Sequence, residues 1–169
     1  MVVDEAWTEM AVLFRALVYA TVFVSLILVF LPARVLEWSG VSRVPGLGIA
    51  QIAGMIVGSI GALLALWCVV TFALIGRGTP APYDTPRGLV VRGPYAYVRN
   101  PMYLGAATAL AGAALFYESL PMLAYLIAFL LVTHAFVRLY EEPTLRRRFG
   151  LEYERYCEGV TRWWPRRPG

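Results

Sequence analysis

The stretch that decides the fold is residues 47–75, LGIAQIAGMIVGSIGALLALWCVVTFALI, which contains no charged residue. At about 1.5 Å per residue, a helix of this length exceeds the roughly 30 Å hydrocarbon core of a bilayer. It therefore predicts a membrane-spanning helix that tilts or protrudes. Gly54, Gly58 and Gly61 place small residues on one helix face. Because such a stripe lets another helix approach closely, we interpret it as a packing surface.

Three further apolar runs extend this pattern to four predicted spans. They cover about residues 11–31, 102–117 and 122–140, and only the turn at 118–121 separates the last two. A break this brief predicts a tight helical hairpin. The sequence therefore predicts a single all-α integral membrane domain over residues 1–169, with about four transmembrane helices and a C-terminal interfacial helical segment.

Composition and charge support a membrane location. Hydrophobic residues make up 59% of the 169 residues, and they come in long blocks that do not suit a water-soluble core. All 15 basic residues are arginines, and they flank the apolar runs, which argues against nucleic acid as a partner. Cys68 and Cys157 differ in surroundings and predict neither a disulfide nor a metal site.

The distribution of arginine predicts the orientation. With four spans, the N-terminus, the 76–101 segment and the tail at 141–169 share one side, which carries most arginines. The other side has only Arg34 and Arg43. By the positive-inside rule the first side is cytoplasmic. We expect a protein of the cell inner membrane with both termini in the cytoplasm.

Two polar stretches, 76–101 and 138–167, carry the candidate chemistry, because one helical hairpin returns the second to the membrane face of the first. Within the first stretch, Asn100 precedes a proline and is expected to be extended, with Pro101 in the first turn of the next helix. A helix N-terminus beside arginines suits an anion or a carboxylate. The alternative is an interfacial belt of tyrosine and arginine that binds no ligand.

The second stretch places polar residues at helical spacing. His134, Arg138, Glu141, Glu142 and Leu145 are predicted to share roughly one helix face. Ionisable groups at the end of a span are costly unless paired, and they often mark functional sites. The alternative is a structural Arg138–Glu142 ion pair with His134 as a donor inside the bundle. The aromatic and charged tail that follows suits either a lid over a site or a membrane anchor.

Several motifs of soluble enzymes are absent from the sequence. There is no P-loop, no Gly-x-Gly-x-x-Gly, no His-Glu-x-x-His, no Cys-x-x-Cys and no Gly-x-Ser-x-Gly. Rossmann-type cofactor binding, metal-dependent hydrolysis and serine acyl transfer therefore lose support.

A series of short motifs over residues 76–167 resembles a known superfamily. The motifs are Gly93-Pro94-Tyr95, Arg99-Asn100-Pro101-Met102-Tyr103-Leu104-Gly105, Glu141-Glu142-Pro143-x-Leu145, Phe149-Gly150-x-x-Tyr153-x-x-Tyr156 and Arg162-Trp163-Trp164-Pro165. In this order, around a helical hairpin, they resemble the isoprenylcysteine carboxyl methyltransferase and phospholipid methyltransferase superfamily. These are membrane-embedded enzymes that use S-adenosylmethionine.

The resemblance implies a role for each matching residue. The implied cofactor-pocket residues are Tyr95, Arg99, Asn100, Pro101, Tyr103, Leu104 and Gly105. Glu141 and Glu142 would hold the polar end of the cofactor, and Arg138 would lie next to the reacting group, so these three are the candidate catalytic residues. The carboxyl methyltransferases usually have histidine at Asn100, and asparagine cannot act there as a cation or base.

The implied reaction is methyl transfer to a lipophilic or small membrane-partitioning acceptor with a carboxylate, amine or thiol. An amine acceptor would need a base, for which Glu141, Glu142 or His134 are candidates. Two other functions stay open from the sequence. One is an NADPH-dependent reductase of the sterol-reductase type, whose members share a similar loop and tail. The other is a non-enzymatic small membrane transporter or assembly subunit.

Overall fold

The protein was analysed as a computed structural model, which describes residues 18, 21–22, 24–41, 46–75 and 88–165. These residues form helices and turns and no strand, in agreement with the predicted all-α class. The elements are η1 (Leu26–Phe30), α2 (Leu31–Trp38), α3 (Ile49–Ile75), η2 (Gly93–Ala96), α4 (Pro101–Phe116), α5 (Leu120–Phe136), η3 (Val137–Glu141), α6 (Glu142–Phe149) and α7 (Leu151–Gly159). Residues 11–17, 19–20 and 23 of the predicted first span, and residues 76–87 of the first polar stretch, lie outside the described residues.

Two helical stretches within the described residues are long and apolar enough to cross a membrane. They are Ile49–Thr71 in α3 and the continuous run Leu120–Phe149, which joins α5, η3 and α6. The helix between them, Pro101–Phe116, is apolar but shorter. The three later apolar runs read from the sequence thus correspond to helices, while the count of four spans stays a prediction.

Helices α3 and α4 pack with their backbones in contact along a glycine seam. The glycine seam consists of Gly54, Gly58 and Gly61 of α3 and Gly105 and Gly112 of α4. A Cβ atom added at Gly54 would lie 2.6 Å from the backbone nitrogen of Phe116, and one at Gly105 would lie 2.8 Å from that of Ala65. The predicted packing role of the stripe in α3 is therefore confirmed.

A tight turn joins α4 to α5, as predicted. Glu118 adopts a positive φ of 47°, and the hydroxyl of Ser119 caps α5 by accepting a hydrogen bond from the Met122 amide. Gln51, which is buried near the start of α3, donates to the Phe116 carbonyl at 3.1 Å. The turn is thereby fixed to the beginning of α3.

The core lies between α4 and α5 and is covered by η1 and α2. Leu110, Met122 and Phe129 are buried there. The π-helical turn η1 departs from the α-helical bonding pattern, and the Tyr125 hydroxyl donates to the Ile27 carbonyl at 2.9 Å. This contact fastens η1 to α5.

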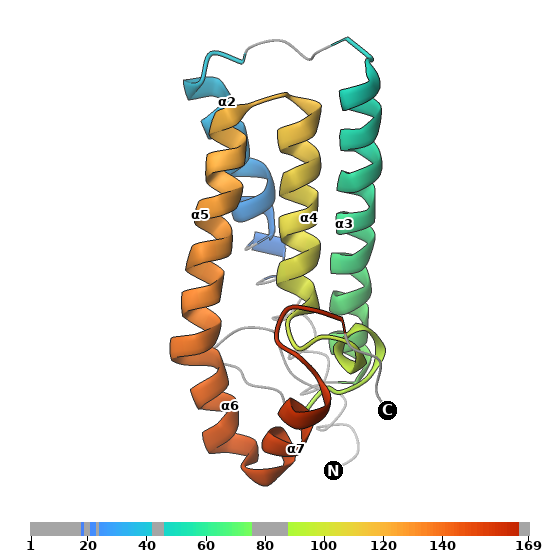
Figure 1. Ribbon diagram of the computed structural model, residues 1–169, viewed down its shortest axis with the longest axis vertical. Helices are drawn as coiled ribbons and strands as arrows, with labels where there is room; N and C mark the ends of the chain where they lie inside the picture. Colours follow the sequence, from blue (N-terminus) through green and yellow to red (C-terminus); the bar gives the residue numbers. More distant parts are fainter. Residues whose placement is uncertain (1–17, 19–20, 23, 42–45, 76–87, 166–169) are drawn as a thin grey trace.

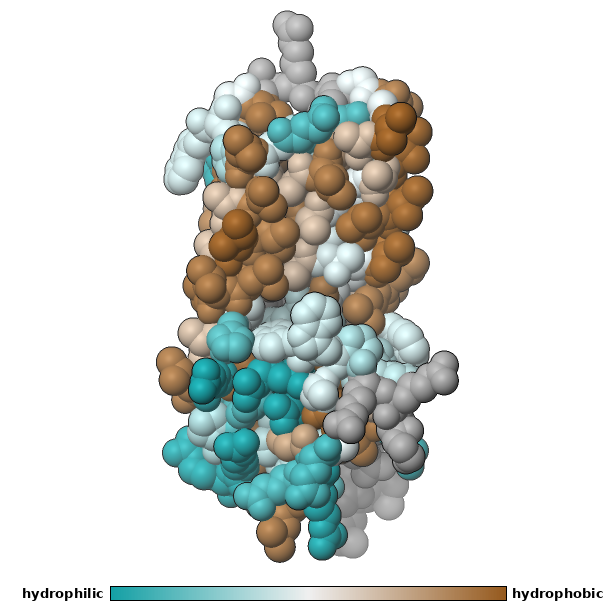
Figure 2. Space-filling view, in the orientation of Figure 1, coloured by the Kyte–Doolittle hydropathy of each residue, from teal (hydrophilic) through white to brown (hydrophobic). Residues whose placement is uncertain are grey.

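The order of the helices brings the two polar stretches to one end of the molecule. Figure 1 shows α3 running to the end where η2 and α4 begin, and α5 returning from the turn to the same end, where α6 and α7 follow. Figure 2 shows hydrophobic residues over the long helices and hydrophilic residues gathered at this end. The predicted meeting of the two stretches is confirmed for their described parts, residues 88–101 and 138–165.

Candidate functional site

The loop before α4 is held against the end of α3 and against α7. Gly93 has a φ of 59°, and a Cβ atom there would lie 3.0 Å from Oγ1 of Thr71. Tyr95 is buried, and its carbonyl oxygen accepts a hydrogen bond of 2.6 Å from the Tyr156 hydroxyl. Burial raises the pKa of Tyr156 above its usual range, so this hydroxyl stays protonated and can donate.

The entry into α4 differs in part from expectation. Pro101 is the first residue of α4, as predicted, but Asn100 has φ −123° and ψ 55° and is not extended. Hydrogen bonds to the C-terminal segment accompany this conformation. The Arg99 amide donates to the Thr161 carbonyl at 2.9 Å, and Nδ2 of Asn100 donates to the Arg162 carbonyl at 3.2 Å.

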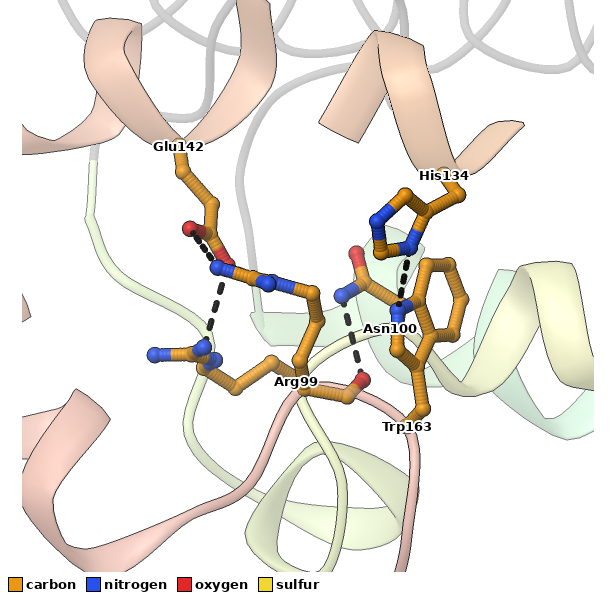
Figure 3. A network of polar contacts seen from close by, with 6 residues as sticks. Arg99, Asn100, His134, Glu142 and Trp163 are labelled. Carbon is orange, nitrogen blue, oxygen red and sulfur yellow. Dashed lines mark hydrogen bonds and ion pairs between the residues drawn. The ribbon is translucent and has the colours of Figure 1, made fainter. Parts of the chain in front are cut away.

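Three charged side chains, which we call the polar clamp, join three separate parts of the chain. The polar clamp consists of Arg99, Glu142 and Arg162. Glu142 is only 3% exposed, and its Oε1 lies 3.0 Å from Arg99 (Figure 3). Arg162 donates to both carboxylate oxygens, from Nε at 2.7 Å and from an Nη atom at 2.6 Å. Hydrogen bonding to Glu142 raises the pKa of Arg162.

A second contact of the C-terminal segment lies about two turns earlier on the same helical run. The indole N–H of Trp163 donates to Nδ1 of His134 at 3.1 Å, and the two rings also stack (Figure 3). Because Nδ1 accepts this bond, the proton of the neutral imidazole lies on Nε2. His134 is therefore placed as an acceptor for the tail and not as a base through Nδ1.

The π-helical turn η3 explains how His134 and Glu142 both reach the tail. On a regular α-helix, residues eight apart are about 80° out of alignment. A single π-turn inserts one residue into the helix, so the effective separation becomes seven and the misalignment falls to about 20°. η3 lies between these two residues, at Val137–Glu141.

The two adjacent carboxylates of this helix face different partners. Glu141 accepts a hydrogen bond of 3.2 Å from the Tyr103 hydroxyl on α4, whereas Glu142 faces the two arginines of the polar clamp. Of the residues predicted to share roughly one helix face, His134 and Glu142 both contact the C-terminal segment, whereas Glu141 contacts Tyr103 on α4.

The structure separates some of the predicted site residues from this cluster. Arg138 is exposed, and Glu142 pairs with Arg99 and Arg162 in place of the alternative Arg138–Glu142 pair. Gly105 packs in the glycine seam, and Leu104 is half-buried on α4. Direct roles for these residues in cofactor binding or catalysis stay predictions.

Sequence reasoning did not place Thr161, Arg162 or Trp163 among the candidate site residues. The signal was present in the motif Arg162-Trp163-Trp164-Pro165. However, Thr161 accepts a hydrogen bond through its backbone carbonyl, which any residue type could do. Glu142, the partner of Arg162, lies twenty residues earlier in the chain. Neither contact can be read from spacing alone.

Two polar groups at the site, the guanidinium of Arg99 and the carboxylate of Glu141, could form further hydrogen bonds with a ligand. Within the described part of the chain, Nε of Arg99 is buried and has no hydrogen-bond partner. A buried, unpaired N–H of a guanidinium is costly, so it suits a ligand with an anionic or carbonyl oxygen. The nearby carboxylate of Glu141 suits a cation or a hydroxyl group.

Comparison with known proteins identifies one family. The family model described as phospholipid methyltransferase matches residues 49–152. This range covers more than half of the chain and contains Arg99, Glu141 and Glu142, but it ends before Arg162. Neither the curated proteins nor the solved structures gave a match.

Proposed function

Because the chain belongs to the phospholipid methyltransferase family, we propose that it is a membrane enzyme that transfers the methyl group of S-adenosylmethionine to a lipophilic acceptor. The observation that carries this proposal is the 3.0 Å ion pair between Arg99 and Glu142. It joins the two stretches in which the family motifs lie. A reaction site built from both stretches requires this proximity.

We further propose a four-span arrangement in the cell inner membrane with both termini in the cytoplasm. The arginine distribution supports this orientation, since most arginines lie at the end that holds the polar clamp. The lipophilic acceptor would reach this end from within the bilayer. Its methylated atom belongs to a carboxylate, an amine or a thiol.

The residues present fit S-adenosylmethionine by their chemistry. The cofactor carries a carboxylate, an ammonium group, a sulfonium and ribose hydroxyls. The unpaired Nε of Arg99 suits the carboxylate, and Glu141 suits the ammonium group or the hydroxyls. Tyr95, Asn100 and Tyr103 would complete the pocket, together with Pro101, Leu104 and Gly105.

The bound cofactor supplies a methyl group that its sulfonium already activates. The chain must therefore orient the acceptor in line with that group and exclude water. Arg138 can hold an anionic acceptor, because a guanidinium forms forked contacts with oxyanions. For an amine acceptor, Glu141 is the best placed base, because both oxygens of Glu142 are occupied by arginines.

The proposal is tested by binding and transfer measurements on the purified protein in lipid nanodiscs. Calorimetry with S-adenosylmethionine and with NADPH should show binding of S-adenosylmethionine alone. Labelled methyl groups should then appear on one of three acceptors, namely a phospholipid amine, an isoprenylcysteine analogue or a lipophilic thiol. Selective binding of NADPH would favour a reductase, and binding of neither would exclude both enzymes.

A pair of variants separates binding from turnover. Glu142→Ala should weaken S-adenosylmethionine binding, because it removes the carboxylate that orders Arg99. Arg138→Ala should leave binding intact and lower kcat, because its proposed contact is with the acceptor. Equal and small effects of both changes would make these residues structural.

A further inference from the structure

Arg162 lies beyond the part of the chain that matches the family, yet it makes polar contacts with two other parts of the site. Its guanidinium binds both oxygens of Glu142, and its carbonyl accepts from Asn100. The side chain therefore reaches α6 while the backbone reaches the start of α4. A membrane anchor needs neither contact.

The residues on either side of Arg162 also contact the start of α4 and the helix α5. The Thr161 carbonyl accepts from the Arg99 amide, and the Trp163 indole donates to His134 on α5. Three consecutive residues thus bind three different helices or helix ends. The segment 160–164 lies across the groups that we propose hold the cofactor.

Among these contacts, the forked pair between Arg162 and Glu142 is expected to be the strongest. It is charge-assisted and bidentate, whereas the contacts of Thr161 and Trp163 are hydrogen bonds between neutral groups. Glu142 is nearly buried, so solvent screens the pair only weakly. Loss of Arg162 would still leave Glu142 neutralised by Arg99, so the fold should survive this change.

We propose that Arg162 is a positioning residue that holds segment 160–164 closed over the site and thereby sets the rate of cofactor release. The inference rests on the proposed function, because it concerns the same cofactor. Arg162 acts through Glu142 and Asn100 and does not itself need to touch the reacting atoms. A tail that served only as an anchor would affect stability and leave release unchanged.

The experiment compares Arg162→Ala and Arg162→Lys with the control Arg155→Ala, which removes an exposed arginine from α7. Labelled S-adenosylmethionine is bound to protein in nanodiscs and chased with unlabelled cofactor. Arg162→Ala should release it about tenfold to a hundredfold faster, on the scale of breaking a largely buried ion pair. Lysine keeps the charge but not the fork, so it should give an intermediate rate. The control should release cofactor at the wild-type rate.

Measurements of kcat and of the melting temperature separate a positioning role from a general loss of structure. At saturating cofactor, kcat of Arg162→Ala should stay within about threefold of wild type, because the reacting groups remain in place. Parallel falls in kcat, affinity and melting temperature would instead show a purely structural role. An unchanged release rate would also overturn the inference.

A measurement without cofactor keeps the inference testable if the proposed function fails. The Arg99 amide is bonded to Thr161, so its hydrogen exchange reports whether the segment is closed. Exchange at Arg99 should accelerate in Arg162→Ala and not in Arg155→Ala. Wild-type protein that binds no S-adenosylmethionine would refute the proposed function, whereas unaltered exchange at Arg99 would refute the positioning role.

Discussion

The glycine seam and the polar clamp hold different parts of the molecule together by opposite means: the seam joins α3 to α4, and the clamp joins the loop before α4, α6 and the C-terminal segment. In the seam, α3 and α4 touch through backbone atoms, because no side chain stands between Gly61 and Gly105. In the clamp, long charged side chains reach across from separate elements to Glu142. The comparison teaches that the packing along α3 and α4 depends on shape, whereas the hydrophilic end of the molecule depends on charge.

This difference follows from the surroundings of each region. Within a bilayer, lipid is as apolar as the side chains, so close packing of small residues drives helix association. At the hydrophilic end, the forked contacts of arginine with a carboxylate give both strength and direction. The stability of the seam should therefore be most sensitive to atoms added where the two backbones touch, and that of the clamp to loss of the Glu142 charge.

The largest expected effect is that of Gly61→Ala. The added Cβ atom would lie 2.6 Å from the carbonyl oxygen of Gly105, and backbone atoms of α4 cannot move aside as a flexible side chain can. We expect a loss of more than about 3 kcal/mol in the free energy of unfolding, at the upper end of overpacking effects. Thermal unfolding in detergent measures it.

The matched control is Gly58→Ala, one turn away on the same helix. A Cβ atom there has no neighbour closer than 3.9 Å, so it makes ordinary contacts. Since alanine also favours the helix over glycine, this change should leave stability unchanged or raise it slightly. Similar melting temperatures for the two variants would contradict the description of the seam.

The next largest effect is expected for Glu142→Gln, which keeps the shape of the clamp and removes its negative charge. Two arginines would then face each other without a carboxylate. We expect a loss of about 2–3 kcal/mol, below the range for fully buried pairs because Arg162 is 28% exposed. Chemical denaturation in detergent tests this value, with Glu152→Gln, an exposed carboxylate on α7, as the control.

If Glu142→Gln proved as stable as the control, charge would not be what holds the clamp. A drop equal to that of Gly61→Ala would instead indicate that the clamp is needed for the bundle to form. Either result would change the comparison between the two regions.

The seam was predictable from sequence and the clamp only in part, for a physical reason. Small residues at spacings of three and four define a helix face without reference to any other segment. The placement of Arg99 and Glu142 at one end followed from the hairpin, but their ion pair did not, since the sequence suggested Arg138 as the partner of Glu142. Their partner Arg162 did not, because its contact depends on the path of the chain after α7.

Local departures from regular geometry account for the remaining differences. The π-turn η3 changes which residues share a helix face. No residue type in Val137–Glu141 predicts a π-turn. Asn100 was expected to be extended before a proline, but it is bonded to the C-terminal segment. Both deviations lie at the candidate site, where competing contacts outweigh local preference.

The smallest expected effect comes from Tyr156→Phe. This change alters neither the backbone packing of the seam nor the charge of the clamp, so it measures the contribution of a single neutral hydrogen bond. The hydroxyl donates to the Tyr95 carbonyl at 2.6 Å and joins α7 to the loop before α4. Its removal leaves that carbonyl without this donor, so we expect a loss of about 1 kcal/mol, measured by thermal unfolding in detergent. Tyr97→Phe is the control, because Tyr97 is exposed in the same loop. A loss for Tyr156→Phe greater than that for Glu142→Gln would mean that α7, and not the charge of the clamp, chiefly fixes the C-terminal segment.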